Sequence, residues 1–262
     1  MRLARLASIL ALLTLPGWGG GASAAPIRVQ LAGAVSHPGT LTLKQRARLS
    51  DAALAAQPRP DAYLLGAAWL RADLQRSQLR LKAGVLFDLG QLQQHALHGD
   101  RTGLAALAGR LRQWLAAMPV TGRQPALLDP RAVEINTAKN HLLADGDQLV
   151  YPRRPGDIRV VGAVVHDCRL PLVPLQDARL YLAACPGDHA ADPDTIYVIE
   201  PDGRVFVQGI ALWNRSTPRV LAPGAVIYVP LRASAIKPID PSLNHDLAAF
   251  LATQLLPGPG VD

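Results

Sequence analysis

The sequence predicts an α+β fold of two tandem domains with the same construction. The chief observation is that Ile158–Leu170 repeats the pattern of Ile27–Leu41. Each segment runs from Ile-Arg-Val into Gly-Ala-Val, then to a histidine and a polar turn, which is typical of a strand that enters a hairpin. The interval from Gly33 to Gly162 is 129 residues. This interval is too long for a solenoid repeat and fits a duplicated domain.

In the first copy, we expect strands at 27–31 and 40–43, followed by a short helix at 49–56 that ends before two prolines. In the second copy, the segment 175–184 echoes this helix, because Leu-Gln-Asp-Ala at its start matches Leu-Ser-Asp-Ala at the start of 49–56. A strand hairpin followed by a short helix is therefore expected in both halves of the chain.

A segment from about 65 to 118 has no counterpart in the second copy. Its apolar residues recur at helical spacing, most clearly in the series Leu104, Leu107, Leu111, Trp114, Leu115 and Met118. A longer and less regular helix precedes this series, with Gly84 or Gly90 as a point of interruption, and Thr102 is the expected N-cap of the second helix. We expect a helical hairpin inserted into the first domain as a satellite, rather than an independent helical domain, because two helices alone bury little core.

After the insertion the pattern returns to strands. We expect strands at 125–128 and 132–135 around a turn at Asp129, and then a closing strand at the end of Leu143–Pro152. The second copy closes in the same way at Leu221–Pro230.

Between its two ends, the second copy carries a strong hairpin signal: strands at 195–199 and 204–208 flank Glu-Pro-Asp-Gly. Strand, strand, helix, strands and final strand is the order of a β-grasp domain. The pattern alone supports a small α+β domain and no more. We expect the first such domain at 25–155 and the second at 156–235, joined by a linker too short to let them move freely.

The last segment, 236–262, is expected to hold an amphipathic helix that begins at Asp240 and Pro241. Its apolar face consists of Leu243, Leu247, Phe250, Leu251 and Leu255. At about 15 residues, this helix is too short to span a membrane. Two roles remain open: the helix docks on its own domain, or it presents its apolar face to a partner or a membrane surface.

Residues 1–24 have the features of a secretory signal peptide. Arg2 and Arg5 precede the apolar run Leu6–Leu15, and Ala22-Ser23-Ala24 offers small residues for cleavage. No later stretch reaches the length of a transmembrane helix, so we expect an exported protein, which in a bacterium means the periplasm.

The chain after residue 24 keeps 25 of the 27 basic residues and all 20 acidic ones, a formal charge of +5. Because the basic residues are scattered and aromatic residues make up only 5% of the sequence, we expect a mildly basic surface and no nucleic-acid partner.

The two cysteines, Cys168 and Cys185, both lie in the second copy. In an oxidising compartment an isolated pair most simply forms a disulfide; two buried free thiols are the alternative. We expect no metal site, because two cysteines without nearby paired histidines fall short of a ligand set.

The sequence contains no Gly-Xaa-Ser-Xaa-Gly, no His-Glu-Xaa-Xaa-His and no glycine-rich phosphate loop followed by lysine. We therefore expect a protein that is not an enzyme and has no cofactor. Two residues are binding candidates. Arg123, the only charged residue between Arg112 and Asp129, would bind a carboxylate or phosphate in a cleft or else pair with Asp129. Trp213 would stack on a sugar ring or else pack in the core.

The paired Gly-Ala-Val and Leu-Ala-Xaa-Gly segments, each closing on Tyr-Pro or Tyr-Val-Pro, resemble the sugar-binding-like β-grasp (SLBB) repeats of outer-membrane polysaccharide exporters. With the signal peptide, the helical hairpin in the first repeat, Asp129-Pro130 before Glu134 and the terminal helix, the chain resembles the GfcC-like capsule biosynthesis family. The resemblance covers essentially the whole chain after residue 24.

This resemblance implies a periplasmic, non-enzymatic role in making or exporting capsule or a related exopolysaccharide. The partners that it implies are the export proteins or the polysaccharide itself. A polysaccharide-modifying enzyme with an unrecognised site is the alternative.

Overall fold

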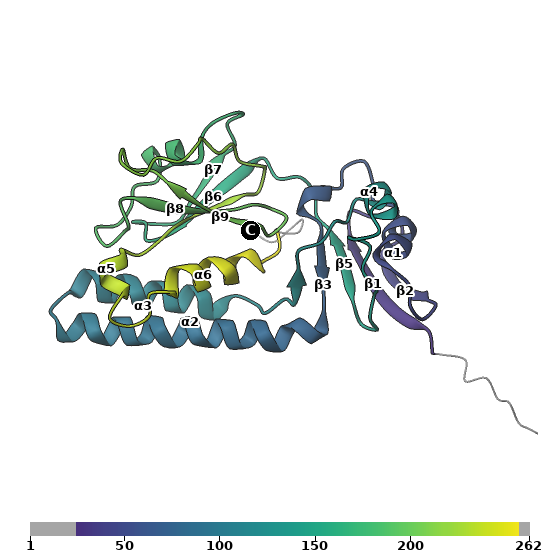
Figure 1. Ribbon diagram of the computed structural model, residues 1–262, viewed down its shortest axis with the longest axis horizontal. Helices are drawn as coiled ribbons and strands as arrows, with labels where there is room; N and C mark the ends of the chain where they lie inside the picture. Colours follow the sequence, from purple (N-terminus) through teal and green to yellow (C-terminus); the bar gives the residue numbers. More distant parts are fainter. Residues whose placement is uncertain (1–24, 257–262) are drawn as a thin grey trace, which may run out of the picture.

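The computed structural model describes residues 25–256, so the expected signal peptide lies outside the described residues. Two five-stranded sheets form its framework (Figure 1). In spatial order, the first sheet consists of β2 (Gly39–Leu43), β1 (Ile27–Gly33), β5 (Gln148–Tyr151), β3 (Ala68–Leu70) and β4 (Arg123–Gln124). The second consists of β7 (Cys168–Pro171), β6 (Asp157–Gly162), β10 (Val226–Val229), β8 (Thr195–Ile199) and β9 (Val205–Gly209).

The two sheets have the same strand order and the same strand directions. β1 and β5 are parallel, as are β6 and β10, while every other neighbouring pair is antiparallel. The isolated bridge between Val35 and Pro58 recurs between Val164 and Gly187, at the 129-residue interval seen in the sequence. The structure therefore contains two similarly built α+β halves.

Glycine is required at the matching bends, Gly33 and Gly162. Their φ angles are 87° and 105°. A Cβ atom would lie 2.1 Å from the carbonyl oxygen of Tyr151 at the first and 2.4 Å from that of Val229 at the second. Glycine recurs in the two Gly-Ala-Val segments because two backbones approach closely at the end of each central parallel strand pair.

One face of the first sheet is covered by α1 (Leu49–Ala56) and α4 (Pro130–Ile135). The core there consists of alternate strand residues and small helix residues, among them Val29, Trp69, Leu149, Tyr151 and Ala53. The corresponding helix of the second half is a 3₁₀ helix, η2 (Ala178–Ala183), and a shorter 3₁₀ turn, η1 (Leu64–Gly66), leads into β3.

The helical insertion consists of α2 (Ala72–His98) and α3 (Thr102–Ala117). It connects β3 to β4, in the place where the second sheet has the tight turn between β8 and β9. Although its ends belong to the first sheet, its apolar face belongs to the core of the second. The prediction that it is a satellite of the first domain is therefore wrong as to packing, because helices inserted at a sheet edge can reach a neighbouring sheet.

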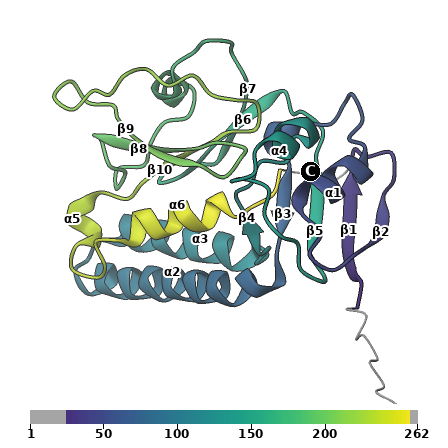
Figure 2. The same cartoon turned by 45° about the vertical axis from the view of Figure 1, so that its right-hand side comes forward.

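The last helices are α5 (Ala233–Ile236) and α6 (Leu243–Ala252). α6 lies between the second sheet and the α2–α3 pair (Figure 2). Asn244 fixes its orientation: its side-chain oxygen accepts hydrogen bonds from the Tyr228 hydroxyl and the Leu231 backbone N–H, both at 3.0 Å. The Asn244 amide also donates to the carbonyl of Leu231 at 2.7 Å.

Several predicted elements are wrong. Residues 125–128 form no strand, and the expected strand at 132–135 is helix α4, because the Asp129 carboxylate caps it by accepting from the N–H groups of Arg131 and Ala132, both at 3.0 Å. Part of the stretch expected to start the insertion is strand β3. α2 is continuous through Gly84 and Gly90, the N-cap of α3 is Arg101, and α6 starts two residues after Pro241.

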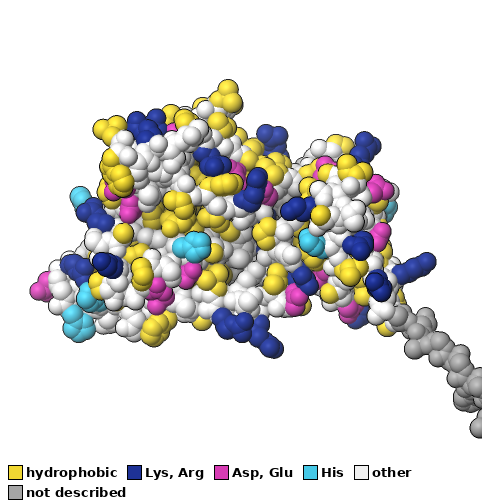
Figure 3. All heavy atoms as spheres, in the orientation of Figure 1, with side chains coloured by type: hydrophobic (Ala, Val, Ile, Leu, Met, Phe, Trp, Pro, Cys, Tyr) yellow, Lys and Arg dark blue, Asp and Glu magenta, His cyan; other side chains and the backbone are white. Residues whose placement is uncertain are grey.

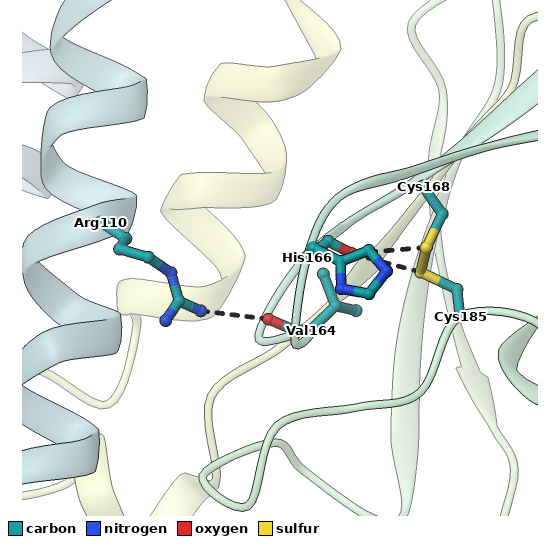
Figure 4. The surroundings of a disulfide bond; sticks show 5 residues. All are labelled: Arg110, Val164, His166, Cys168 and Cys185. Carbon is teal, nitrogen blue, oxygen red and sulfur yellow. Dashed lines mark hydrogen bonds between the residues drawn. A yellow bond between two sulfur atoms is a disulfide. The ribbon is translucent and has the colours of Figure 1, made fainter.

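Cys168 and Cys185 form a disulfide that ties the start of β7 to the end of η2. The two sulfur atoms lie 3.4 and 3.6 Å from the carbonyl oxygen of His166, and Arg110 of α3 donates to the carbonyl of Val164 in the same turn (Figure 4). Within residues 25–256, no helix combines the length and the apolar character needed to cross a membrane.

Replacing both cysteines by alanine tests the contribution of the disulfide. Position 56 in the first half, which corresponds to 185, is already alanine, so the side chain fits this site. With a sequence separation of 17 residues, we expect the double variant to lose about 3 kcal/mol of unfolding free energy in urea titrations. In the presence of dithiothreitol, the unfolding free energy of the wild-type protein should fall by a similar amount. Equal stability of variant and wild type would contradict this role.

Candidate functional site

The most constrained polar region lies where the two sheets meet. Three segments converge there: β4 with its preceding residues, the turn between β8 and β9, and the chain that follows α6. Figure 1 shows the described end of the chain running between the two sheets.

Arg123 joins these three segments. Its side chain is buried, with 5% exposure. One terminal nitrogen donates to the carbonyl of Gln254 at 2.9 Å, and the other donates to the carbonyl of Pro201. Burial lowers the pKa of Arg123 to about 10, so the guanidinium is still charged at neutral pH. Because its two terminal nitrogens bind carbonyls of two different segments, the side chain of Arg123 links β4 to the β8–β9 turn and to the chain after α6.

The surrounding residues fix the backbone on which Arg123 sits. The Gln78 amide of α2 donates to the carbonyl of Arg123 at 2.9 Å and accepts from the N–H of Gly122 at 2.8 Å. The Thr121 hydroxyl accepts from the N–H of Arg123 at 3.0 Å and donates to the carbonyl of Thr253 at 2.7 Å. The insertion and the chain after α6 are therefore tied to the same short strand.

The last described residue, Leu256, packs between the two halves. Leu256 lies beside Gly66 and Gly224, where an added Cβ would come within 2.5 and 2.7 Å of its methyl groups. Any larger residue at either glycine would displace Leu256.

Two further polar groups are enclosed near this junction. Glu200 is 8% exposed, and burial raises its pKa. Its carboxylate accepts a long contact of 3.4 Å from the N–H of Ala222. The Tyr63 hydroxyl has no hydrogen-bond partner within the described part of the chain. Burial raises the pKa of Tyr63 to about 12, and Arg154 lies 5.8 Å from its ring centre.

Neither of the two roles predicted for Arg123 matches its surroundings in the structure. It lies in a junction rather than an open cleft, and it does not pair with Asp129, whose carboxylate caps α4. Sequence reasoning missed Glu200, Gln78 and Tyr63. Glu200 carried no signal, because Glu-Pro-Asp-Gly is also an ordinary hairpin turn.

Trp213 lies in the loop after β9 and is 77% exposed, so it does not pack in a core. Its indole N–H donates to the Asp194 carboxylate at 3.3 Å. By contrast, four residues of the apolar face predicted for the last helix, whose role was left open between docking on its own domain and facing a partner, are buried in the structure; these are Leu243, Leu247, Phe250 and Leu251. The helix docks on its own chain.

No group of three or more His, Cys, Asp or Glu side chains within residues 25–256 is arranged to hold a metal ion. On the face in Figure 3, basic and acidic side chains are interspersed.

Comparisons with known proteins match both halves of the chain. Residues 23–153 match the family model "Capsule biosynthesis GfcC, N-terminal", and residues 166–256 match "Capsule biosynthesis GfcC C-terminal". The chain is also 32% identical over 153 residues to "Uncharacterized protein YjbG" of Escherichia coli (strain K12). That alignment covers 58% of this chain and 62% of the relative, which is less than two thirds of its length.

Replacing Arg123 by methionine tests whether its two hydrogen bonds to backbone carbonyls stabilise the junction. The buried carbonyl of Pro201 and the half-buried carbonyl of Gln254 would lose their donor, so we expect a loss of about 2–4 kcal/mol of unfolding free energy. Limited proteolysis should also cut the variant faster near residues 119–123 and after α6. The matched control is Arg131→Met, an exposed arginine, which should change stability by less than about 0.5 kcal/mol. Equal effects of the two substitutions would refute the role of Arg123.

Proposed function

Because the chain belongs to the GfcC capsule biosynthesis family, we propose that it is a non-enzymatic accessory protein of capsule or exopolysaccharide biosynthesis. It acts by binding the polymer or the export machinery. We also propose that both halves have the β-grasp fold, of the kind found in SLBB repeats, with the helical insertion in the first half.

The observation that carries this proposal is the fixed junction between two similarly built halves. Arg123 and Thr121 hold the halves together by donating to backbone carbonyls of the second half and of the chain after α6, and Gln78 fixes the backbone of Arg123. A rigid pair of similar modules presents several surfaces in a constant arrangement, which favours recognition because little conformational freedom is lost on binding.

Two of the buried carboxylates, those of Asp147 and Asp177, have structural roles, which supports binding over catalysis. Asp147, 1% exposed, accepts from the Trp69 indole at 2.9 Å and from the Ala144 N–H at 2.9 Å. Asp177 accepts from the Gln208 amide at 2.7 Å and pairs with Arg179 at 2.7 Å. These carboxylates hold strands and turns in place.

A periplasmic location is part of the proposal. It rests on the signal-peptide pattern of residues 1–24 and on the disulfide, since disulfides persist in oxidising compartments.

The second candidate function is a polysaccharide-modifying enzyme. Glu200 favours it in one respect, because burial raises its pKa toward that of a general acid. Its enclosure at the junction disfavours it, because a polymer chain would have to reach a carboxyl that is 8% exposed.

Incubating the purified protein with polymer from the producing organism separates the two functions. We expect the polymer to slow the protein in affinity electrophoresis, while its chain length in size-exclusion chromatography stays unchanged after prolonged incubation. Dextran in the gel serves as the control for non-specific retardation. Shortened chains or released sugars that disappear in Glu200→Gln would establish the enzyme instead.

A further inference from the structure

We propose that Trp213 and an adjacent hollow at one end of the second sheet form a contact site for a sugar ring of the polymer. This inference rests on the proposed function and names the part of the molecule that touches the polymer.

The hollow lies where β6, β9 and β10 end and β8 begins. Its volume is about 370 Å³, within the range of roughly 300–1,000 Å³ that small-molecule sites occupy. Apolar side chains form part of its wall, namely Leu182, Ile210 and Val229. Polar residues of the loop before β8 and the N-cap of α5 also line it: Asp188, His189, Asp192 and Arg232.

The first half shows why the hollow is open. Tyr151 pairs with Gly33 as Val229 pairs with Gly162, so the two residues occupy equivalent positions. Tyr151 is fully buried, and its hydroxyl donates to the carbonyl of Leu128 at 3.1 Å. Valine at this position has no ring to fill the corresponding space. The hollow therefore lies where the second half has a smaller side chain than the first.

Trp213 is linked to the wall of the hollow through Asp194. The N–H of Ile210, which lines the hollow, donates to the carbonyl of Asp194 at 2.8 Å. The carboxylate of the same Asp194 accepts from the Trp213 indole. The Asn214 amide also donates to the Asp194 carbonyl, at 3.0 Å. The loop thus holds a large aromatic ring in place although 77% of its surface is exposed.

A sugar ring fits this combination chemically. One of its faces presents C–H groups, which pack on an aromatic ring, and hydroxyl groups surround its edge. His189 and Arg232 are exposed and can serve those hydroxyls, and the Arg232 guanidinium is held at the rim by a 3.3 Å hydrogen bond to the carbonyl of His189. Apolar walls with a few fixed polar groups are the ordinary composition of a small-ligand site.

A protein partner would use the same loop differently. Leu212, beside Trp213, is 87% exposed, and a protein interface would bury both side chains together. A sugar that stacks on the indole and enters the hollow depends on Trp213 but not on Leu212. The two residues therefore distinguish the two kinds of ligand.

The test measures affinity for oligosaccharides prepared from the organism's own polymer, by isothermal titration calorimetry. We expect Trp213→Ala to weaken binding about tenfold or more, because an aromatic contact and its buried area are lost. Trp213→Phe should stay within about threefold of wild type, since it keeps an aromatic face. Leu212→Ala is the matched control for exposure and should bind as wild type does. Thermal unfolding confirms that each variant is folded.

The outcomes separate this site from the proposed function. If wild-type protein does not bind the oligosaccharides, polymer binding and this site both fail. If wild type binds and Trp213→Ala binds equally well, the site is refuted and the proposed function stands. If Trp213→Ala and Leu212→Ala both abolish capture of an export protein and leave sugar affinity unchanged, the loop is a protein-docking surface and the inference is overturned.

Discussion

The burial of α6 between the second sheet and the α2–α3 pair is the interaction on which the rest of the structure depends. Leu243, Leu247 and Phe250 are fully buried there, and burying each such side chain stabilises the fold by about 1.5–3 kcal/mol. α2 and α3 belong covalently to the first sheet, whereas α6 ends the second half. Packing them together therefore joins the halves, and Arg123 and Leu256 complete the connection with the segment that follows α6.

Equivalent faces of the two sheets differ in burial: a helix covers this face in the second half, and it is partly exposed in the first. In the second sheet, the face that carries Tyr228 and Val161 is buried under α6. In the first sheet, the corresponding positions are Val150 and Ala32, both half-buried, and their neighbours on that face include the exposed Arg28 and Gln148. Because polar side chains cover part of this face, it is stable in contact with water, and the first half needs no helix there. The helix that this half contributes can instead complete the core of its neighbour.

Sequence reasoning predicted the elements with strong local signals. The repeat of Ile27–Leu41, the hairpin at 195–209 and the helical insertion depend on glycine bends, turn residues and apolar spacing. Strand β3 has only three residues, which is too few to give a recognisable strand pattern. The strand expected at 132–135 is a helix, because Asp-Pro starts a helix as readily as a turn. The partners of Arg123 could not be predicted, because backbone carbonyls brought together by tertiary packing leave no pattern in the sequence. Trp213 was identified by its residue type, while its exposure and its hollow required the structure.

The central claim is that the two sheets form one rigid body through α6 and the α2–α3 pair. The most direct measurement is the distance distribution between spin labels at Thr42 in β2 and Arg215 in the loop after β9, both exposed positions, by double electron–electron resonance. The account predicts a single narrow distribution that is unchanged when polymer is added. A broad or two-peaked distribution in the otherwise unaltered protein would show that the halves move independently and would contradict it.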